Sequence, residues 1–357
     1  MNNINYGEMN DIEIKKEDIL LTEEWDKVFP KNENVNHKKV TFVNHFGITL
    51  AADQYEPKNY DGKLPAIAVC GPYSAVKEQV SGRYAQEMAS RGFLTIAFDP
   101  SYYGESGGLP RYMNSIDHCV EDYQSAIDYL SNLENVDNEK IGIIGICGWG
   151  GYALQTASLD TRIKATLTST MYDMSRVSSF GYNDSNDEDA RYEARVAYNK
   201  ARTEDYKNKK YTLVGGNPNP EELPEDAPQF LKDYVQFYKV RGYHKRSLGS
   251  NNGFSYSSLG SLMNTKMLDY TNEIRSAVLM IHGENAHSCY MGKDAYNDMI
   301  KDSKYTDNKE LVIVPNATHC DLYDQKDKNA SLMKLSLVNC FRIVMKTMLD
   351  FLRLIRV

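Results

Sequence analysis

Apolar residues along this chain gather in short runs that are separated by longer amphipathic stretches. Four runs have the length and composition of strands buried on both faces, at residues 64–70, 93–98, 141–146 and 165–169. Stretches with helical spacing or helix-favouring residues lie between them, at 81–91, 115–133 and 150–158. Strands that alternate with helices form βαβ units, so we expect a mainly parallel sheet covered by helices on both faces.

The beginning of the chain has different patterns. Residues 39–43 and 48–55 alternate apolar and polar positions, which predicts an antiparallel hairpin ahead of the parallel strands. Residues 1–36 are expected to form an N-terminal extension. A short helix is predicted there at 22–29, attached to the body of the protein by two aromatic residues, Trp25 and Phe29.

The alternation of strands and helices stops at about residue 171. The following residues are rich in charge, Tyr, Asn and Pro, and they contain no run typical of a buried strand. Helices are expected there at 188–206, opened by a capping box at Ser185–Glu188, and at 230–240. An insertion over the edge where parallel sheets bind ligands favours a cap, and a surface elaboration away from the site is the alternative.

The alternation resumes at about residue 273. The expected elements are strands at 276–281 and 310–314, a helix at 293–300 and a long apolar closing helix at 332–354. The predicted organisation therefore has an N-terminal extension, an α/β core in two pieces and a mostly helical cap, with bounds of 1–36, 37–170 and 273–357, and 171–272, respectively.

Composition excludes several classes of partner. The chain has 357 residues and a net charge of −8 with both signs interspersed, whereas nucleic-acid binding would require a basic stripe. No apolar run approaches the ~18 residues of a membrane span, and residues 1–18 lack the apolar segment of a secretory leader. The six cysteines are scattered without zinc-binding spacing, so we expect free thiols in the cytoplasm, no metal and no cofactor. Homodimer formation is left open.

One reactive atom lies in the glycine-rich stretch from Lys140 to Leu154, which joins a predicted strand to the following helix. This atom is the sulfur of Cys147, which is flanked by Gly145 and Gly148. A nucleophile on such a turn needs a strained backbone without bulky neighbours, and the helix directs its N-terminal N–H groups at the thiol. The alternatives are a buried small hydrophobe and a loose dinucleotide fingerprint at Gly148–Ala153.

The order of residues along the chain supports the nucleophile. Acyl transfer by a thiolate needs a base, a carboxylate that orients the base, and N–H donors for the oxyanion. In α/β-hydrolases the nucleophile, the acid and the histidine follow one another in that order. Here Cys147 is followed by acids after later strands and then by His319, in the loop after the final predicted strand. An α/β-hydrolase fold is therefore predicted, with Cys147 as nucleophile and His319 as base.

The acid is usually found a few residues after the penultimate strand. Glu284 stands there, directly after Gly283, and Ala286 occupies the position where an aspartate is common. Glu284 is therefore the first candidate. Asp173, after the strand that precedes the cap, is the alternative. A cysteine–histidine pair can also work with a weak orienting group or with none.

The oxyanion donors are predicted from two loops. The residue after the nucleophile, Gly148, contributes its N–H, and the second donor comes from the loop after the 64–70 strand. Pro72 in that loop has no N–H, so Tyr73 is expected to supply it. Glu78 lies close by in sequence and can contact Cys147 or Lys77. A carboxylate favoured by a helix N-terminus is an equally good explanation for Glu78.

Together these residues resemble a bacterial α/β-hydrolase family related to dienelactone hydrolases and acetyl-xylan-esterase-like proteins. The matching motifs extend over essentially the whole chain: LTEEWDKVF at 21–29, GPYSAVKEQ at 71–79, FDPSYYGESGGLPR at 98–111, GICGWGG at 145–151, MYDMSRV at 171–177, HGENAHS at 282–288 and ATHCDLYD at 317–324. Dienelactone hydrolases use a cysteine nucleophile, so the resemblance implies that role for Cys147. Asn285 and His287 depart from the pattern, because some relatives carry acidic residues there.

The expected function is hydrolysis of an ester, lactone or thioester of a small-molecule acyl substrate through an acyl-cysteine intermediate. Aromatic residues in the predicted cap indicate a partly apolar pocket. The alternative is a ligand-binding or sensor protein on a hydrolase scaffold with weak turnover, which Ala286 motivates. An oxidoreductase with a dinucleotide cofactor is disfavoured, because the glycine-rich stretch follows a late strand and no ribose-binding acid accompanies it.

Overall fold

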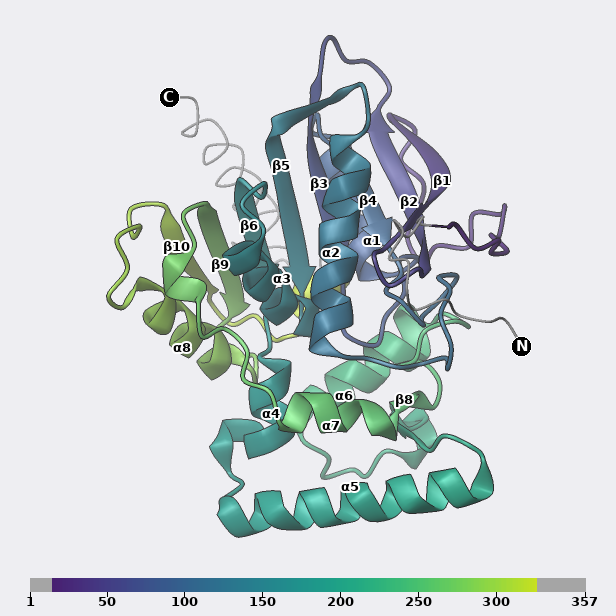
Figure 1. Ribbon diagram of the computed structural model, residues 1–357, viewed down its shortest axis with the longest axis vertical. Helices are drawn as coiled ribbons and strands as arrows, with labels where there is room; N and C mark the ends of the chain where they lie inside the picture. Colours follow the sequence, from purple (N-terminus) through teal and green to yellow (C-terminus); the bar gives the residue numbers. More distant parts are fainter. Residues whose placement is uncertain (1–14, 326–357) are drawn as a thin grey trace, which may run out of the picture.

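An eight-stranded sheet forms the centre of the protein, which the computed structural model describes over residues 15–325 (Figure 1). The strand order is β1-β2-β4-β3-β5-β6-β9-β10, with β1–β2 and β2–β4 antiparallel and the remaining neighbours parallel. The strands are Val35–Val43 (β1), Thr49–Pro57 (β2), Leu64–Cys70 (β3), Leu94–Phe98 (β4), Val136–Ile146 (β5), Ala165–Ser169 (β6), Ala277–Gly283 (β9) and Lys309–Val314 (β10). The predicted mainly parallel sheet is confirmed.

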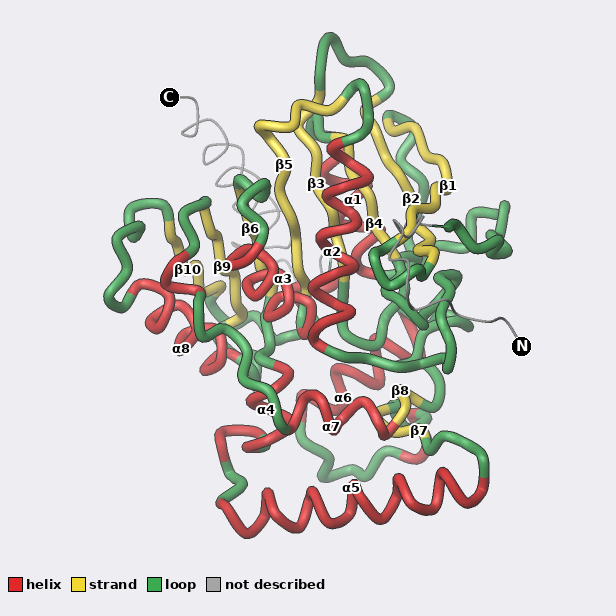
Figure 2. Tube along the Cα trace, viewed as in Figure 1, coloured by secondary structure: helices red, strands yellow, loops and turns green. Residues whose placement is uncertain are grey.

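Helices cover both faces of this sheet (Figure 2). The strands are apolar on both sides, and each face buries its side chains against a different set of helices. One face packs against Val80–Ala89 (α1) and Asp321–Asp324 (α9). The other packs against Ile116–Ser131 (α2), Gly148–Leu159 (α3) and Cys289–Ile300 (α8).

Residues 170–276, called here the β6–β9 segment, lie beyond one end of the sheet (Figure 1). The α-helices of the segment are Met174–Phe180 (α4), Glu188–Asn208 (α5), Gln229–Val235 (α6) and Leu259–Met263 (α7), and α6 continues as a π-helix over Gln236–Arg241 (η3). Its 3-10 turns are Tyr182–Asp184 (η1), Pro220–Glu222 (η2), Tyr256–Ser258 (η4) and Thr271–Glu273 (η5). Two short strands, Leu213–Gly215 (β7) and Gly253–Ser255 (β8), pair antiparallel.

Two local predictions were wrong, and one pair of short strands was missed. Residues 22–29 form no helix, because tertiary contacts take their polar groups: the Val28 N–H donates to the Glu78 carbonyl. The helix α5 is capped by Asp187, whose side chain accepts from the Ala190 N–H, rather than by Ser185. The pair β7–β8 was not expected. The predicted closing helix at 332–354 lies outside the described residues.

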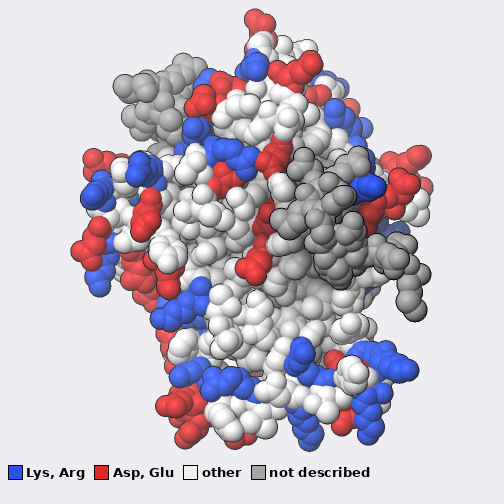
Figure 3. Space-filling view, viewed as in Figure 1, with Lys and Arg blue, Asp and Glu red and all other residues white. Residues whose placement is uncertain are grey.

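Charged side chains of both signs are mixed over the face shown in Figure 3. Within residues 15–325, no helix combines the length and the apolar character that crossing a membrane requires. The five cysteines of this part of the chain are free, buried thiols.

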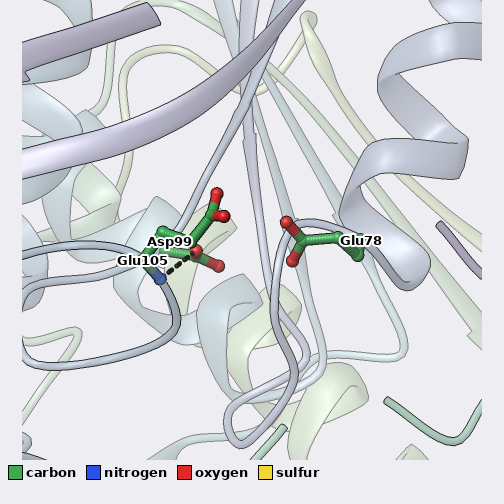
Figure 4. A group of neighbouring side chains, drawn as sticks. All are labelled: Glu78, Asp99 and Glu105. Carbon is green, nitrogen blue, oxygen red and sulfur yellow. Dashed lines mark hydrogen bonds between the residues drawn. The ribbon is translucent and has the colours of Figure 1, made fainter. Parts of the chain in front are cut away.

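A completely buried lysine holds the loop between β3 and α1 in place. The Lys77 Nζ lies 2.7 Å from a carboxylate oxygen of each of three acids, Glu78, Asp99 and Glu105. One carboxylate oxygen from each of these acids lies within 4.8 Å of the corresponding oxygens of the other two, and Figure 4 shows the Glu78 carboxylate facing those of Asp99 and Glu105. Burial alone would lower the pKa of Lys77, but the surrounding carboxylates raise it well above its usual value, so the ammonium stays charged.

The same acids connect two other parts of the chain to this lysine. The Thr22 N–H donates to Glu105 at 2.6 Å, which attaches the N-terminal extension. Arg246 of the β6–β9 segment binds Glu78 at 2.7 Å and Asp26 at 2.6 Å. The cluster around Lys77 therefore joins the extension, the core and the β6–β9 segment.

Replacement of Lys77 by methionine should destabilise the protein strongly. The substitution leaves three buried carboxylates without their central cation, and breaking a buried ion pair typically costs about 3–5 kcal/mol of unfolding free energy. Urea unfolding of Lys77→Met measures the loss. Lys140→Met is the matched control, because Lys140 pairs with Asp137 at the surface and should cost less than about 1 kcal/mol. Equal losses in the two variants would show that the buried cluster is not important for stability.

Candidate active site

Cys147 occupies a strained turn between β5 and α3. Its φ of 57° and ψ of −127° place a non-glycine residue in a sparsely populated backbone region. The turn is compact because Gly145 allows close packing: a Cβ there would lie 2.2 Å from the Trp149 carbonyl oxygen. The Cys147 N–H donates to the Ser169 carbonyl at 2.9 Å, which fixes the turn to β6. Such strain at the end of a central strand exposes the side chain to the space beyond the sheet.

Two backbone N–H groups point at the Cys147 sulfur. They belong to Gly148 and Tyr73, the two residues predicted as oxyanion donors. Gly71 brings the Tyr73 loop against the turn, because its φ is +101° and a Cβ there would lie 2.2 Å from the Ile146 carbonyl oxygen. The β6–β9 segment holds the same loop, since the Ser247 hydroxyl and the Gly249 N–H donate to the Ser74 carbonyl at 3.0 Å each.

The Cys147 thiol is protonated at rest. Burial raises the pKa of Cys147 above its ordinary value, although its hydrogen bonds with the Tyr323 hydroxyl and with the N–H groups of Tyr73 and Gly148 lower it in part. The N-terminus of α3 favours the thiolate but does not overcome the loss of hydration. A thiolate at this position would therefore have to form during a reaction rather than before it.

His319 lies in the loop after β10, as predicted, and it is buried. Its Nδ1 lies 2.6 Å from the Thr170 hydroxyl oxygen and 2.8 Å from that of Ser288. Its Nε2 lies 3.0 Å from the hydroxyl of Tyr323. Burial lowers the pKa of His319 well below its usual value, and the nearby His287 lowers it further. The imidazole is therefore neutral, with Nε2 directed toward the Cys147 side of the site.

Neither predicted acid contacts His319. Glu284 is exposed, and its carboxylate accepts a hydrogen bond from the Asn316 N–H at 2.9 Å. Asp173 caps helix α4, where its Oδ1 accepts from the N–H groups of Ser175 and Arg176. The structure therefore does not bring Glu284 or Asp173 to the imidazole, and two hydroxyl groups occupy the position of the orienting acid.

Glu78 does not contact Cys147. Its carboxylate binds Lys77 and Arg246, each at 2.7 Å. The contact with Lys77 is one of the two contacts that the sequence suggested for Glu78. Its effect on the site is indirect, because it belongs to the loop that carries Tyr73.

A cavity of about 290 Å³ opens onto the Cys147 sulfur. The core contributes Tyr73 and Cys147 to its wall, and the β6–β9 segment contributes a set of mainly aromatic and apolar side chains: Tyr172, Met174, Val177, Tyr182, Phe230, Leu231, Tyr234 and Tyr238. Among the described residues that line this cavity, none carries a charged side chain. The cavity can therefore accept an uncharged, partly apolar group next to the sulfur.

Sequence reasoning missed Thr170, Ser288 and Tyr323. The first two carry no pattern of their own, and only the packing of three loops brings their hydroxyls to His319. Tyr323 had a signal: it follows His319 by four residues in the ATHCDLYD motif, a spacing that places two side chains on one side of a helical turn.

The sequence profile of the X-Pro dipeptidyl-peptidase family (S15 family) matches residues 47–321, which include Cys147 and His319. An uncharacterized protein of Pseudomonas aeruginosa, PA2218, is 49% identical over 313 residues, 87% of this chain and 82% of its own. Its crystal structure superimposes with a TM-score of 0.83 at 46% identity, covering 91% of this chain and 98% of that one.

Two further proteins are similar over most of their length. The uncharacterized protein YcjY of Escherichia coli is 34% identical over 303 residues, 81% of this chain and 94% of its own. The alpha/beta hydrolase GrgF from Penicillium has a TM-score of 0.66 at 17% identity, covering 89% of this chain and 98% of that one, a likeness of fold alone. The chain therefore belongs to the X-Pro dipeptidyl-peptidase (S15) family, a family of hydrolases, and its fold is that of the α/β-hydrolases.

Proposed function

We propose that the protein hydrolyses an ester, lactone or thioester of a small uncharged acyl group through an acyl-Cys147 intermediate. The observation that carries the proposal is the convergence on one sulfur of a strained turn and two N–H donors, from Gly148 and Tyr73. After attack, the carbonyl carbon is bonded to sulfur, and the same N–H groups are placed to stabilise the negative oxygen beside it.

His319 is the base of the proposed reaction. With a proton on Nδ1, the unprotonated Nε2, which faces the Tyr323 hydroxyl, is the acceptor of the proton that leaves the thiol. The hydroxyl oxygens of Thr170 and Ser288 accept the Nδ1–H. The resulting imidazolium then protonates the leaving group and, in deacylation, accepts a proton from water. Hydroxyl groups orient the ring but stabilise an imidazolium less than a carboxylate does. A thiol tolerates this better than an alcohol, because its proton is more acidic.

The cavity supports the substrate class. A peptide amino terminus carries a positive charge and would need a carboxylate partner, whereas the side chains of the described residues that line this cavity are uncharged. The family name includes a dipeptidyl-peptidase, but the wall next to Cys147 suits a neutral acyl group. We propose that the β6–β9 segment acts as a cap, because it supplies most of that wall.

A ligand-binding or sensor protein with weak turnover is the second candidate. It is favoured by one observation: among the described residues no carboxylate contacts His319, whose pKa is low. Such a protein would form the acyl-cysteine and release it very slowly.

Replacement of Cys147 by alanine should abolish both acylation and turnover. Incubation of the wild type with a neutral acyl thioester or p-nitrophenyl ester should add the mass of one acyl group, measured by intact-protein mass spectrometry. Cys147→Ser should acylate at least about 100-fold more slowly, since a serine hydroxyl depends more strongly on its base. Wild-type turnover by Cys147→Ala would contradict the proposal. A stable acyl-enzyme without release across many esters and thioesters would favour the sensor protein.

Loss of the two hydroxyls next to Nδ1 should lower activity, whereas loss of the Glu284 charge should not. The variant Thr170→Val/Ser288→Ala removes both oxygen partners of Nδ1, and we expect kcat/KM to fall by about 10- to 100-fold. Glu284→Gln should remain within about twofold of the wild type, because its carboxylate contacts only the Asn316 N–H in the described residues. Steady-state kinetics of both variants distinguish the two orienting groups, and the reverse result would restore Glu284 as the acid.

The pH dependence of kcat/KM should have its acid limb below the usual histidine pKa of about 6.5. His319 must be unprotonated to accept the thiol proton, and its lowered pKa keeps it neutral to more acidic pH. The raised pKa of Cys147 means that ionisation of the resting thiol adds no limb in the neutral range. Initial rates between pH 5 and 9, at constant ionic strength, test this. A half-maximal rate at pH 6.5 or above would indicate an imidazolium stabilised by a carboxylate.

A further inference from the structure

Tyr323 lies between the two residues of the proposed catalytic pair. Its hydroxyl is 3.0 Å from the Nε2 of His319, and it also forms a hydrogen bond with the Cys147 sulfur. The side chain is fully buried, with its ring centroid 5.3 Å from that of His319 and 5.1 Å from that of Phe237. The phenol therefore occupies the path between thiol and imidazole.

Contacts from several directions hold Tyr323 at this position. The Tyr84 hydroxyl on α1 donates to the Leu322 carbonyl at 2.6 Å. The Thr318 N–H donates to Asp321 at 2.8 Å, which closes the turn between His319 and α9. Arg241 of the β6–β9 segment binds the Asp324 carboxylate at 2.9 Å. Because α9 is attached to both the core and the β6–β9 segment, the hydroxyl has little freedom to leave the path.

We propose that the Tyr323 hydroxyl relays the proton from Cys147 to His319 during acylation, a role that rests on the proposed function of Cys147 as nucleophile. A hydroxyl has one hydrogen and two lone pairs, so it can accept from the thiol while it donates to Nε2. As the sulfur–carbon bond forms, the S–H bond breaks and its proton moves to the phenol oxygen. The original phenol proton moves to Nε2 in the same step.

The relay leaves Tyr323 unchanged and His319 as an imidazolium. When the tetrahedral intermediate collapses, the same path in reverse delivers one proton to the leaving oxygen or sulfur, and the imidazole is neutral again. Burial raises the pKa of Tyr323 well above its usual value, and the neighbouring Cys147 and Tyr238 raise it further. The two transfers are therefore coupled, because neither a phenolate nor a doubly protonated phenol persists in this surrounding.

The variant Tyr323→Phe tests the relay, because it removes the hydroxyl and keeps the ring. The rate of Cys147 acylation, measured as the burst of p-nitrophenol from a neutral ester, should fall by about 100-fold. We expect KM to stay within about threefold of the wild type. Tyr129→Phe is the matched control: its hydroxyl bonds to Gln54, far along the chain from the site, and its burst should equal that of the wild type. Thermal unfolding of both variants reports on folding.

A second measurement needs no variant. Acylation of the wild type in mixtures of H₂O and D₂O should give a curved dependence on deuterium fraction, since two protons move in one step. Tyr323→Phe should give a straight line. A linear dependence in the wild type, or a burst of Tyr323→Phe within twofold of the wild type, would overturn the relay. If Cys147→Ala also shows a wild-type burst, the proposed function fails as well, so the two failures are distinguishable.

Discussion

The charge of one buried ammonium group, that of Lys77, determines how three parts of the chain meet. Its three carboxylate partners lie in the loop after β3 and in the loop after β4, and two of them also bind the N-terminal extension or the β6–β9 segment. A buried charge is unfavourable without a partner of opposite sign. The buried carboxylates of the core therefore depend on Lys77, and Glu78 depends also on Arg246 of the β6–β9 segment. The loop of Tyr73 is positioned as a result, and with it one side of the site at Cys147.

Much of the fold could be predicted from periodicity. The strands β3 and β6 have the predicted bounds, and β5 differs only by an earlier start, because continuous apolar runs leave few alternatives in a parallel sheet. The failure at 22–29 has a physical cause: the backbone there bonds to the core rather than to itself. The β7–β8 pair is too short for a periodic pattern to indicate it.

Part of the candidate site could be predicted from the sequence, and part could not. Cys147, Gly148 and Tyr73 could be inferred because backbone geometry imposes small neighbours and an N–H donor at fixed sequence offsets. The hydrogen-bond partners of His319 Nδ1 could not be inferred, because the prediction of Glu284 depended on the order of residues along the chain alone. The hydroxyls of Thr170 and Ser288 meet the ring where a carboxylate was expected, and only the packing of separate loops brings them there. The result is a site whose resting groups are all neutral.

This neutrality has a consequence for the redox chemistry of the sulfur. Peroxides and disulfides react with thiolates, and susceptibility follows thiolate character and exposure. Cys147 is a buried, protonated thiol, enclosed by backbone N–H groups and tyrosine hydroxyls. An oxidant therefore meets an unreactive sulfur, whereas in the proposed reaction the acyl substrate supplies the electrophile for which the proton can leave. If Cys147 is the nucleophile as proposed, the protonation state of the resting thiol separates oxidation from acylation.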